Sequence, residues 1–254
     1  MIARFLRGRT AARQPVASIP AGRRIYAIGD IHGRLDLLDA LLARIEHDDA
    51  QRDTAESEIF LLGDLIDRGP ESAQVIERAI DLSSRPFKTR FLLGNHEEIF
   101  LKALAGDLKT LAFFTRIGGR ETILSYGISE QEYRDCDYPE LLELLRARVP
   151  QEHIAFLQRF EDLIVVGDYA FVHAGIRPDR PLEDQQTSDL RWIRSEFLEH
   201  RGPFEKVIVH GHTVTADAEL KPHRIGLDTG AYASDKLTAM GFEGNTRWVL
   251  DTAT

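Results

Sequence analysis

Residues 91–98 read FLLGNHEE, and the interpretation of the whole chain starts from this stretch. Its apolar run is typical of a buried strand, and Gly94 ends the run because glycine accepts the backbone angles of a tight exit. A turn explains the glycine. It does not explain why Asn95 and His96 follow side by side, so we ask whether other strands end in the same way.

The same kind of ending occurs four more times along the chain. IYAI at 25–28 runs into GDIHGR, and IFLL at 59–62 runs into GDLIDRGP. YAFV at 169–172 is followed by HAG, and VIVH at 207–210 is followed by GHT. A single Gly-Asp is usually only a turn. Five apolar runs that each meet a small residue beside a metal-binding side chain are hard to explain by turn chemistry alone.

Stretches with helical periodicity separate the first apolar runs. They are LDLLDALLARIEHD at 35–48 and ESAQVIERAIDL at 71–82, and such an alternation is typical of a layered α/β domain. From about residue 101 to residue 162 the pattern is mostly helical, which predicts an insert that interrupts the strands. The last two apolar runs, within 236–250, predict a hairpin with its turn at Gly244-Asn245.

We expect a mobile leader at residues 1–23 and one domain at residues 24–254. The leader has four arginines before Gln14 with only single or paired apolar residues between them. It therefore lacks the apolar centre of a secretory signal. No apolar run in the chain approaches the ~18 residues of a membrane span, so no stable membrane insertion is expected.

Charge and cysteine content narrow the class of partner. The 32 basic and 41 acidic residues give a net charge of -9, which argues against nucleic acid, because backbone binding depends on clustered Lys and Arg. Cys136 is the single cysteine, so an intrachain disulfide and a thiolate metal site are both excluded. This usage suits a reducing cytoplasm, where we expect the protein. The oligomeric state stays open.

We expect the five strand ends to form one polar site, because the carboxyl ends of neighbouring strands in βα sheets converge on one edge. The side chains placed there are Asp30, His32, Asp64, Asn95, His173 and His212. Three oxygen donors and three imidazoles suit Mn, Fe or Zn better than Ca. Two ions ~3.5–4 Å apart with a shared carboxylate would use all six ligands and would activate a bridging water for attack on phosphorus.

The blocks GDIHG, GDLIDRG, GNHEE, HAG and GHT, in this order, resemble the signature of the metallophosphoesterase superfamily. The first two are most similar to its phosphoprotein phosphatase branch, which includes bacterial and phage serine/threonine phosphatases. Diadenosine tetraphosphatases have very similar blocks. The resemblance extends from about Arg24 to the end of the chain. It implies the calcineurin-like fold, an α/β fold with a layered β-sandwich core and flanking helices.

The resemblance also implies a role for each matching residue. Asp30 and His32 would bind the first metal ion, Asp64 would bridge both ions, and Asn95, His173 and His212 would complete the second. His96 matches the general acid that protonates the leaving alkoxide, and Asp67 matches its carboxylate partner. Arg68 and Asn95 would contact the substrate phosphate. This chemistry is reasonable because His titrates near neutrality and Arg offers a fork suited to phosphate.

Some assignments stay open at this stage. SDLRWIRSEFL at 188–198 resembles the LxWxR segment of bacterial members, which favours Arg194 as a second phosphate clamp, with Arg191 as the alternative. Glu97 and Glu98 would open a helix, where its dipole favours acids, and a supporting hydrogen bond from Glu97 is the other interpretation.

The remaining candidates are given structural interpretations. His47, His153 and His200 are expected to face solvent, His223 has no match, and Asp228 is interpreted as turn structure. His210 precedes Gly211 and would line the site.

Three functions compete. The segment FFTRIGGRETILSYG at 113–127 is similar to a segment of bacterial phosphoprotein phosphatases, which favours a serine/threonine protein phosphatase. The alternative is a symmetrical diadenosine tetraphosphatase or another nucleotide hydrolase. A silent binding module is disfavoured because every ligand is retained, and Val214, where GHTH would place a histidine, argues against diesterase chemistry. We expect a phosphoprotein or a small phosphorylated substrate and two divalent ions, with Mn favoured over Fe or Zn.

Overall fold

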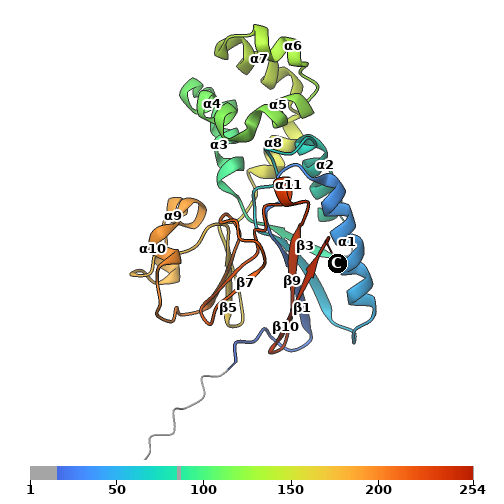
Figure 1. Ribbon diagram of the computed structural model, residues 1–254, viewed down its shortest axis with the longest axis vertical. Helices are drawn as coiled ribbons and strands as arrows, with labels where there is room; N and C mark the ends of the chain where they lie inside the picture. The colour runs from blue at the N-terminus through green and yellow to red at the C-terminus, as the bar shows by residue number, and fades with distance from the viewer. Residues whose placement is uncertain (1–15, 85–86, 254) are drawn as a thin grey trace, which may run out of the picture.

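The computed structural model describes residues 16–84 and 87–253. Two five-stranded sheets pack face to face (Figure 1). The first has the order β10-β9-β1-β2-β3, with strands β1 (Arg23–Ile28), β2 (Glu56–Leu61), β3 (Lys88–Phe91), β9 (Thr238–Glu243) and β10 (Thr246–Asp251). The second has the order β4-β5-β6-β8-β7, with β4 (Leu163–Val166), β5 (Tyr169–Val172), β6 (Val207–His210), β7 (Glu219–Leu220) and β8 (Arg224–Gly226). The predicted α/β fold with a layered β-sandwich core is confirmed.

The strands that end in polar residues are parallel within each sheet. β1, β2 and β3 run parallel in the first sheet, and β5, β6 and β8 run parallel in the second. The prediction that the five strand ends meet at the edge of one sheet was therefore wrong. The five strand ends belong to two sheets, because the helical insert that separates β3 from β4 starts a second sheet rather than extending the first.

Side-chain alternation along the strands builds the core between the sheets and the layers outside them. In β1, Ile25 and Ala27 face the second sheet, where they pack in one cluster with residues such as Phe171 and Val209. Their neighbours, such as Tyr26, point to the opposite face and join a different cluster with helical residues. This period of two is what a strand buried on both faces requires.

Helices cover the outer face of each sheet (Figure 1). α1 (Leu35–Ala50) and α2 (Ser72–Ser83) pack on the first sheet, where Leu38, Leu42 and Val75 are buried. α9 (Thr187–Trp192) and α10 (Ser195–Leu198) pack on the second through Leu190 and Phe197. The first helices supply the crossover connections that parallel strands need.

A block of helices lies above the strand ends (Figure 1). It consists of α3 (Asn95–Leu104), α4 (Leu108–Phe114), a π-helical turn η1 (Thr115–Gly119), α5 (Arg120–Ser125), α6 (Glu130–Asp135), α7 (Tyr138–Arg148) and α8 (Gln151–Leu157). Two short helices elsewhere are η2 (Leu182–Asp184) and α11 (Ala231–Ser234). His153 in α8 was expected to face solvent, and this was wrong. It is buried, with Nδ1 3.0 Å from the hydroxyl of Tyr126, because α8 turns this face into the helical block.

The predicted leader falls partly outside the described residues. Residues 1–15 lie outside them, while residues 17–19 contact both sheets. Ile19 is buried in the core between the sheets, and its N–H donates to the carbonyl of Gly244 at 2.9 Å. In the part of the chain that the structure describes, no helix is long and apolar enough to cross a membrane.

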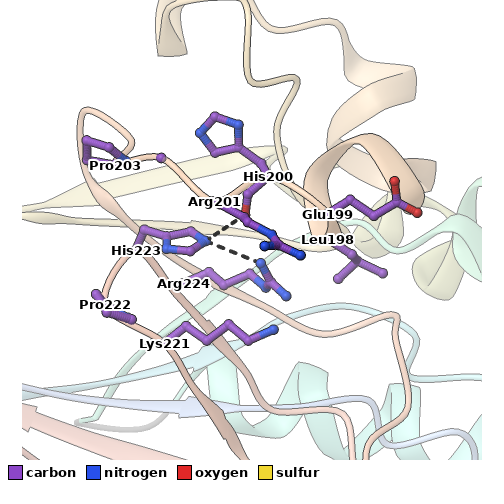
Figure 2. A pocket seen from close by; sticks show the side chains of 10 residues that line it. Leu198, Glu199, His200, Arg201, Pro203, Lys221, Pro222, His223 and Arg224 are labelled. Carbon is purple, nitrogen blue, oxygen red and sulfur yellow. Dashed lines mark hydrogen bonds between the residues drawn. The ribbon is translucent and has the colours of Figure 1, made fainter.

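The two ends of the second sheet differ in character. At the carboxyl end of β6, the chain enters Gly211-His212, within the predicted polar site. At the amino ends of β6 and β8 lies a cavity of about 840 Å³, lined by residues from 198–203 and 221–224 (Figure 2). The predicted site and this cavity are therefore separate places in the fold.

Candidate active site

Backbone strain is concentrated where the strands end. The φ angles are 48° at His32, 51° at Asp64, 72° at Asp67, 69° at Arg68 and 62° at His212. A residue with a Cβ loses roughly 1–2 kcal/mol in this left-handed region. Within residues 16–84 and 87–253, the one other non-glycine residue with such an angle is Asp235. Strain held at so many neighbouring polar positions is a feature of functional sites.

Two groups of buried side chains have the spacing of metal ligands. One group is His32, Asp64 and His96, and the other is Asp64, His173 and His212, with the ligand atoms of each group within 4.8 Å of one another. Asp64 is common to both. The Nε2 atom of His212 is buried and has no hydrogen-bond partner. A buried imidazole nitrogen without a partner, beside carboxylates, suits a divalent cation.

The rings of His32 and His173 differ in protonation. The Nδ1 atom of His32 lies 2.7 Å from the carbonyl of Ile66, and that of His173 lies 2.8 Å from the carbonyl of Leu62. Because a carbonyl only accepts, each Nδ1 carries a proton. Nε2 of His32 lies 2.8 Å from Nη1 of Arg68 and accepts from it. Burial would lower the pKa of His173, but Asp64 outweighs burial and raises it to about 10, so Nε2 of His173 is protonated as well and donates to Asn95 Oδ1. Burial lowers the pKa of His32 to about 3, so this ring is neutral.

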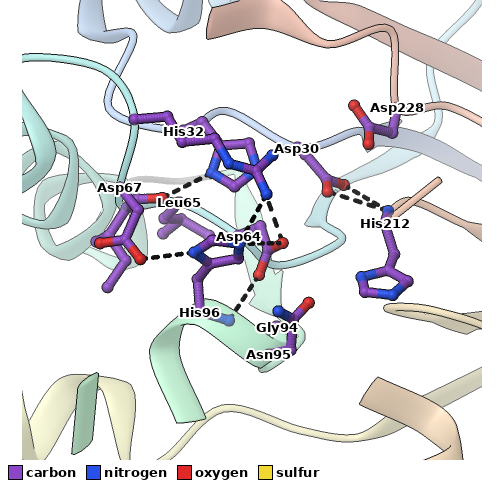
Figure 3. A network of polar contacts seen from close by, with 12 residues as sticks. Asp30, His32, Asp64, Leu65, Asp67, Gly94, Asn95, His96, His212 and Asp228 are labelled. Atoms are coloured by element: carbon purple, nitrogen blue, oxygen red, sulfur yellow. Dashed lines mark hydrogen bonds and ion pairs between the residues drawn. The ribbon is translucent and has the colours of Figure 1, made fainter. Parts of the chain in front are cut away.

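Four of the predicted metal ligands contact one another in pairs that the sequence did not show. Asp30 accepts two hydrogen bonds from the backbone N–H of His212, at 3.1 and 3.0 Å, and lies between His32 and His212 (Figure 3). Asn95 Oδ1 is 3.0 Å from Nε2 of His173. His96, predicted as the acid, joins the first donor group in place of Asp30. All six predicted ligands nevertheless lie around one site.

The two predicted aspartate ligands, Asp30 and Asp64, differ in their electrostatics. Burial raises the pKa of Asp30 well above its ordinary value, and Asp228 adds to this. Burial would also raise the pKa of Asp64, but His173 and His96 hold it well below its ordinary value. Asp64 is thus the carboxylate most strongly held in the charged form, as a ligand shared by two cations would need to be.

Behind His96 lies a chain of hydrogen bonds into the helical block. His96 Nδ1 donates to Asp67 Oδ2 at 2.6 Å, and Asp67 Oδ1 accepts from Thr122 Oγ1 at 2.6 Å. The backbone N–H of Asp67 lies 2.9 Å from both Thr122 Oγ1 and Ser72 Oγ. The sequence paired His96 with Asp67 correctly in space. It missed Thr122, whose signal was its place in the 113–127 segment.

Arg68 and a proton compete for the other nitrogen of His96. Nη2 of Arg68 lies 3.1 Å from His96 Nε2, an arrangement that fits an unprotonated nitrogen. Burial lowers the pKa of His96, but Asp64 and Asp67 more than offset this and raise it above its ordinary value. The ring therefore has a raised proton affinity, although its Nε2 accepts a hydrogen bond from Arg68 in this arrangement.

Glu97 holds the strand ends together. Its buried carboxylate accepts backbone N–H groups of Gly94 at 3.0 Å, Asp64 at 2.9 Å, Leu65 at 2.8 Å and Ile66 at 3.3 Å. The hydrogen-bonding interpretation of Glu97 therefore applies. A Cβ on Gly94 would lie 2.1 Å from Asp64 Oδ1, so close approach to this carboxylate is what requires glycine in the opening motif.

The two candidate arginines have different surroundings. Arg191 donates to Asp162 Oδ1 at 2.6 Å and lies 3.7 Å from a carboxylate oxygen of Glu98, so two acids already hold it. Arg194 is exposed. Burial and His173 lower the pKa of His212 to about 2, and the charge of Arg194 adds to this effect. Arg194 therefore stays the predicted second phosphate clamp.

Further residues border the site. Asp228 keeps its predicted turn role, with Oδ1 accepting the N–H of Gly230 at 2.9 Å, but it is buried and faces the site beside Asp30 (Figure 3). Tyr232 was missed altogether. Its ring lies 4.7 Å from the guanidinium carbon of Arg68, a cation–π contact that helps to place the arginine.

His210 does not line the site as expected. It is buried on the outer face of the second sheet, where its ring meets Phe197 edge-on at 4.9 Å. Side chains alternate between faces along β6, so His210 points away from the core-facing side of Val209.

Comparison with known proteins is consistent with this geometry. Curated relatives named symmetrical bis(5'-nucleosyl)-tetraphosphatase include one from Acidovorax sp. (strain JS42), 34% identical over 72% of this chain and 51% of the relative. One from Yersinia enterocolitica is 34% identical over 85% of this chain and 62% of the relative. One from Vibrio parahaemolyticus is 25% identical over 89% and 98%. The chain spans about half the length of most of the curated relatives it matches.

Solved structures share the fold at low identity. A candidate diadenosine tetraphosphatase has a TM-score of 0.63 and 21% identity, covering 92% of this chain and 98% of the other. A cold-active protein tyrosine phosphatase has a TM-score of 0.60 and 20% identity, covering 92% and 81%. The model of the calcineurin-like phosphoesterases matches residues 23–240, a span that contains every strand-end residue described above, and the chain belongs to this family.

Proposed function

We propose that this protein is a dinuclear-metal phosphoesterase that hydrolyses dinucleoside tetraphosphates symmetrically. The observation that carries the chemistry is the sharing of buried Asp64 by two donor groups, with the His96–Asp67 pair beside them. The substrate class is supported by the names of the curated relatives.

The donor set fits two divalent ions. Asp30, His32 and Asp64 would hold one, and Asp64, Asn95, His173 and His212 would hold the other, with Mn favoured over Fe or Zn. When bound, such ions polarise a phosphoryl group and lower the pKa of a coordinated water. The unpartnered Nε2 of His212 is the atom that most directly supports a cation at this place.

The chain's own residues would orient the substrate and move the proton. Arg68 and Arg194 would hold phosphate oxygens, since arginine forks suit phosphate geometry. A phosphate that drew Arg68 toward its oxygens would free Nε2 of His96 to take up a proton from solvent, which His96 would then deliver to the leaving oxygen. Asp67 would keep the ring oriented through its 2.6 Å hydrogen bond.

The substrate preference differs from the one that the sequence favoured. The 113–127 segment pointed to a serine/threonine protein phosphatase. In the structure, this segment supplies Thr122 to Asp67 and the carbonyl of Gly118 to the N–H of Arg68, at 3.0 Å. These contacts support a role in building the phosphate site, which any phosphoester substrate would need, so the resemblance does not mark a protein substrate.

The test is a side-by-side assay on one purified batch with Mn added. It compares ADP release from diadenosine tetraphosphate with phosphate release from phosphoserine and phosphothreonine peptides, with Asp64→Asn as the inactive control. We expect ADP as the main product. Strong peptide turnover with little ADP would support the protein phosphatase instead, and ATP with AMP would contradict symmetrical cleavage.

A further inference from the structure

The cavity at the amino ends of β6 and β8 has the character of a second binding site. It encloses about 840 Å³ between residues 198–203 and residues 221–224 (Figure 2). Ligand pockets typically measure ~300–1,000 Å³. The four residues of β6, at about 3.3 Å each, separate it from the metal edge by roughly 13 Å of strand, so the cavity is not an extension of the proposed active site.

The cavity is lined by several positively charged side chains, although the protein as a whole is acidic. The chain carries a net charge of -9, yet Arg201, Lys221 and Arg224 all line this cavity. The charged ends of the three side chains point toward one another, while the carboxylate of Glu199 points away from them (Figure 2). Three cations that converge in a concave space attract anions.

One of the three cations is buried and already positioned. The side chain of Arg224 is 3% exposed, and its Nε donates to a carboxylate oxygen of Glu219 at 2.9 Å. Lys221 uses the other oxygen of the same carboxylate, at 2.6 Å. The Glu219 carboxylate thus pairs with both Lys221 and Arg224, and Arg201 adds a third positive charge to the cavity. A buried guanidinium held in place before binding loses little freedom when it contacts a ligand.

Polar contacts and ring stacking also hold the wall of the cavity in place. Nε2 of His223 lies 3.1 Å from the carbonyl of His200 and 3.3 Å from Nη1 of Arg224. The ring of His200 stacks on Phe204 with centroids 4.7 Å apart. These contacts link the 198–203 loop to the start of β8, so the cations sit on a fixed frame.

We propose that this cavity binds an oligophosphate, an anion with two or more linked phosphoryl groups. Two guanidinium forks match phosphate oxygens, and a third cation matches additional negative charge. The volume exceeds what one phosphate needs. The proposal does not depend on the hydrolytic activity, because no residue of the metal edge lines the cavity.

The test is calorimetric titration of the full chain with a methylene-bridged triphosphate, which resists hydrolysis. Arg201→Ala with Lys221→Ala should lower the affinity ~10-fold or more, because two charge-assisted contacts are lost. Arg201 is exposed and the Lys221 side chain is 42% exposed, so we expect the double variant to fold, and its melting temperature checks this.

Two controls distinguish binding in this cavity from binding elsewhere on the protein. Lys109→Ala with Arg134→Ala removes the same charge from exposed positions in the helical block and should leave binding unchanged. The proposed active site would itself bind polyphosphate, so the titrations are repeated in the Asp64→Asn background, where binding in the cavity should remain. Equal binding with and without the cavity substitutions in that background would overturn the proposal, as would complete loss of binding in Asp64→Asn. A parallel titration with the methylene-bridged analogue of ATP distinguishes a free oligophosphate from a nucleotide, and dependence on Arg201 and Lys221 in either case supports the site.

Discussion

His96 has two opposed neighbours, and their balance sets its chemistry. Asp67 accepts a hydrogen bond from the Nδ1–H of His96, while Arg68 donates to its Nε2. The two acids nearby favour a charged ring, and the arginine favours a neutral one. The ring nitrogen also lies within the first donor group, with His32 and Asp64. Substitution can therefore distinguish a proton donor from a metal ligand.

We expect His96→Asn to lower turnover of alkyl phosphates ~100-fold or more and turnover of aryl phosphates much less, because an aryl leaving group needs little protonation. Metal content per chain should not change. Steady-state kinetics on the two substrate classes, with metal analysis of the same samples, checks this. An equal loss on both classes, or loss of an ion, would contradict the acid role.

Thr122 acts on the reaction through Asp67. Thr122→Val removes the hydroxyl that donates to Asp67 Oδ1 at 2.6 Å and leaves a buried carboxylate oxygen without that partner, a cost of ~1–3 kcal/mol. We expect turnover of alkyl phosphates to fall ~10-fold, with a smaller fall for aryl phosphates.

Thr122→Ser provides the matched control, because serine retains the hydroxyl. It should restore most of the activity toward alkyl phosphates. If valine and serine variants lost activity equally, packing of α5 rather than the hydrogen bond would account for the effect. Melting temperatures of both variants show how much of the change is structural.

Between elements, polar side chains join helices to strands at a few points. Glu97, at the start of α3, holds the backbone after β2 and β3. At the other end of the first sheet, Asp48 of α1 accepts from Tyr26 at 2.7 Å, from Trp248 at 3.0 Å and from Arg52 at 2.8 Å. One carboxylate therefore connects α1 with β1 and β10.

The Asp48 contacts predict a pH-dependent stability. Burial raises the pKa of Asp48, but hydrogen bonds from Arg52 and Tyr26 outweigh burial and lower it below the ordinary value. A carboxyl group with a depressed folded-state pKa stabilises the protein above its unfolded-state pKa of ~3.9, and this contribution disappears as pH falls through the folded-state value. Asp48→Asn should cost ~1 kcal/mol at pH 7 and progressively less below about pH 4.

Urea unfolding at a series of pH values measures this difference. Asp39→Asn is a control on the same helix, since its carboxylate is 51% exposed and pairs with Arg78 at the surface. Exposed ion pairs contribute little, so this variant should resemble the wild type. A pH-independent loss in Asp48→Asn would mean that shape rather than charge makes the contribution.

Across the whole molecule, the candidate metal site joins the two sheets. Asp64 follows β2 of the first sheet, whereas His173 and His212 follow β5 and β6 of the second. Ions bound by these residues would connect the two layers and would offset repulsion between the buried acids Asp30 and Asp228.

Metal removal should therefore destabilise the entire fold. Ligands that bind the native state raise its stability by mass action, about 2.7 kcal/mol at one hundred times Kd. We expect chelation to lower the melting temperature and added Mn to restore it, with little response to either in Asp64→Asn. Scanning calorimetry with metal analysis checks this, and a wild-type melting temperature that ignores chelation would argue against bound ions.

The sequence by itself determined the local features of this protein. Apolar runs of four residues and helical periodicity predicted most strands and helices, because the periods of 2 and 3.6 are properties of single elements. Gly94, Asn95 and His96 could be recognised as a strand end with chemistry, since a turn and its polar neighbours are adjacent in the chain. The order of such endings then indicated the family.

Only the tertiary structure decided how these pieces meet. It divided the strand ends between two sheets and brought Thr122 to Asp67 across 55 residues. It also paired Arg191 with Asp162 and left Arg194 exposed. His153 is buried although the two residues before it, Gln151 and Glu152, are polar and exposed. Such contacts depend on how whole layers pack and on which buried groups find hydrogen-bond partners, and no local pattern carries that information.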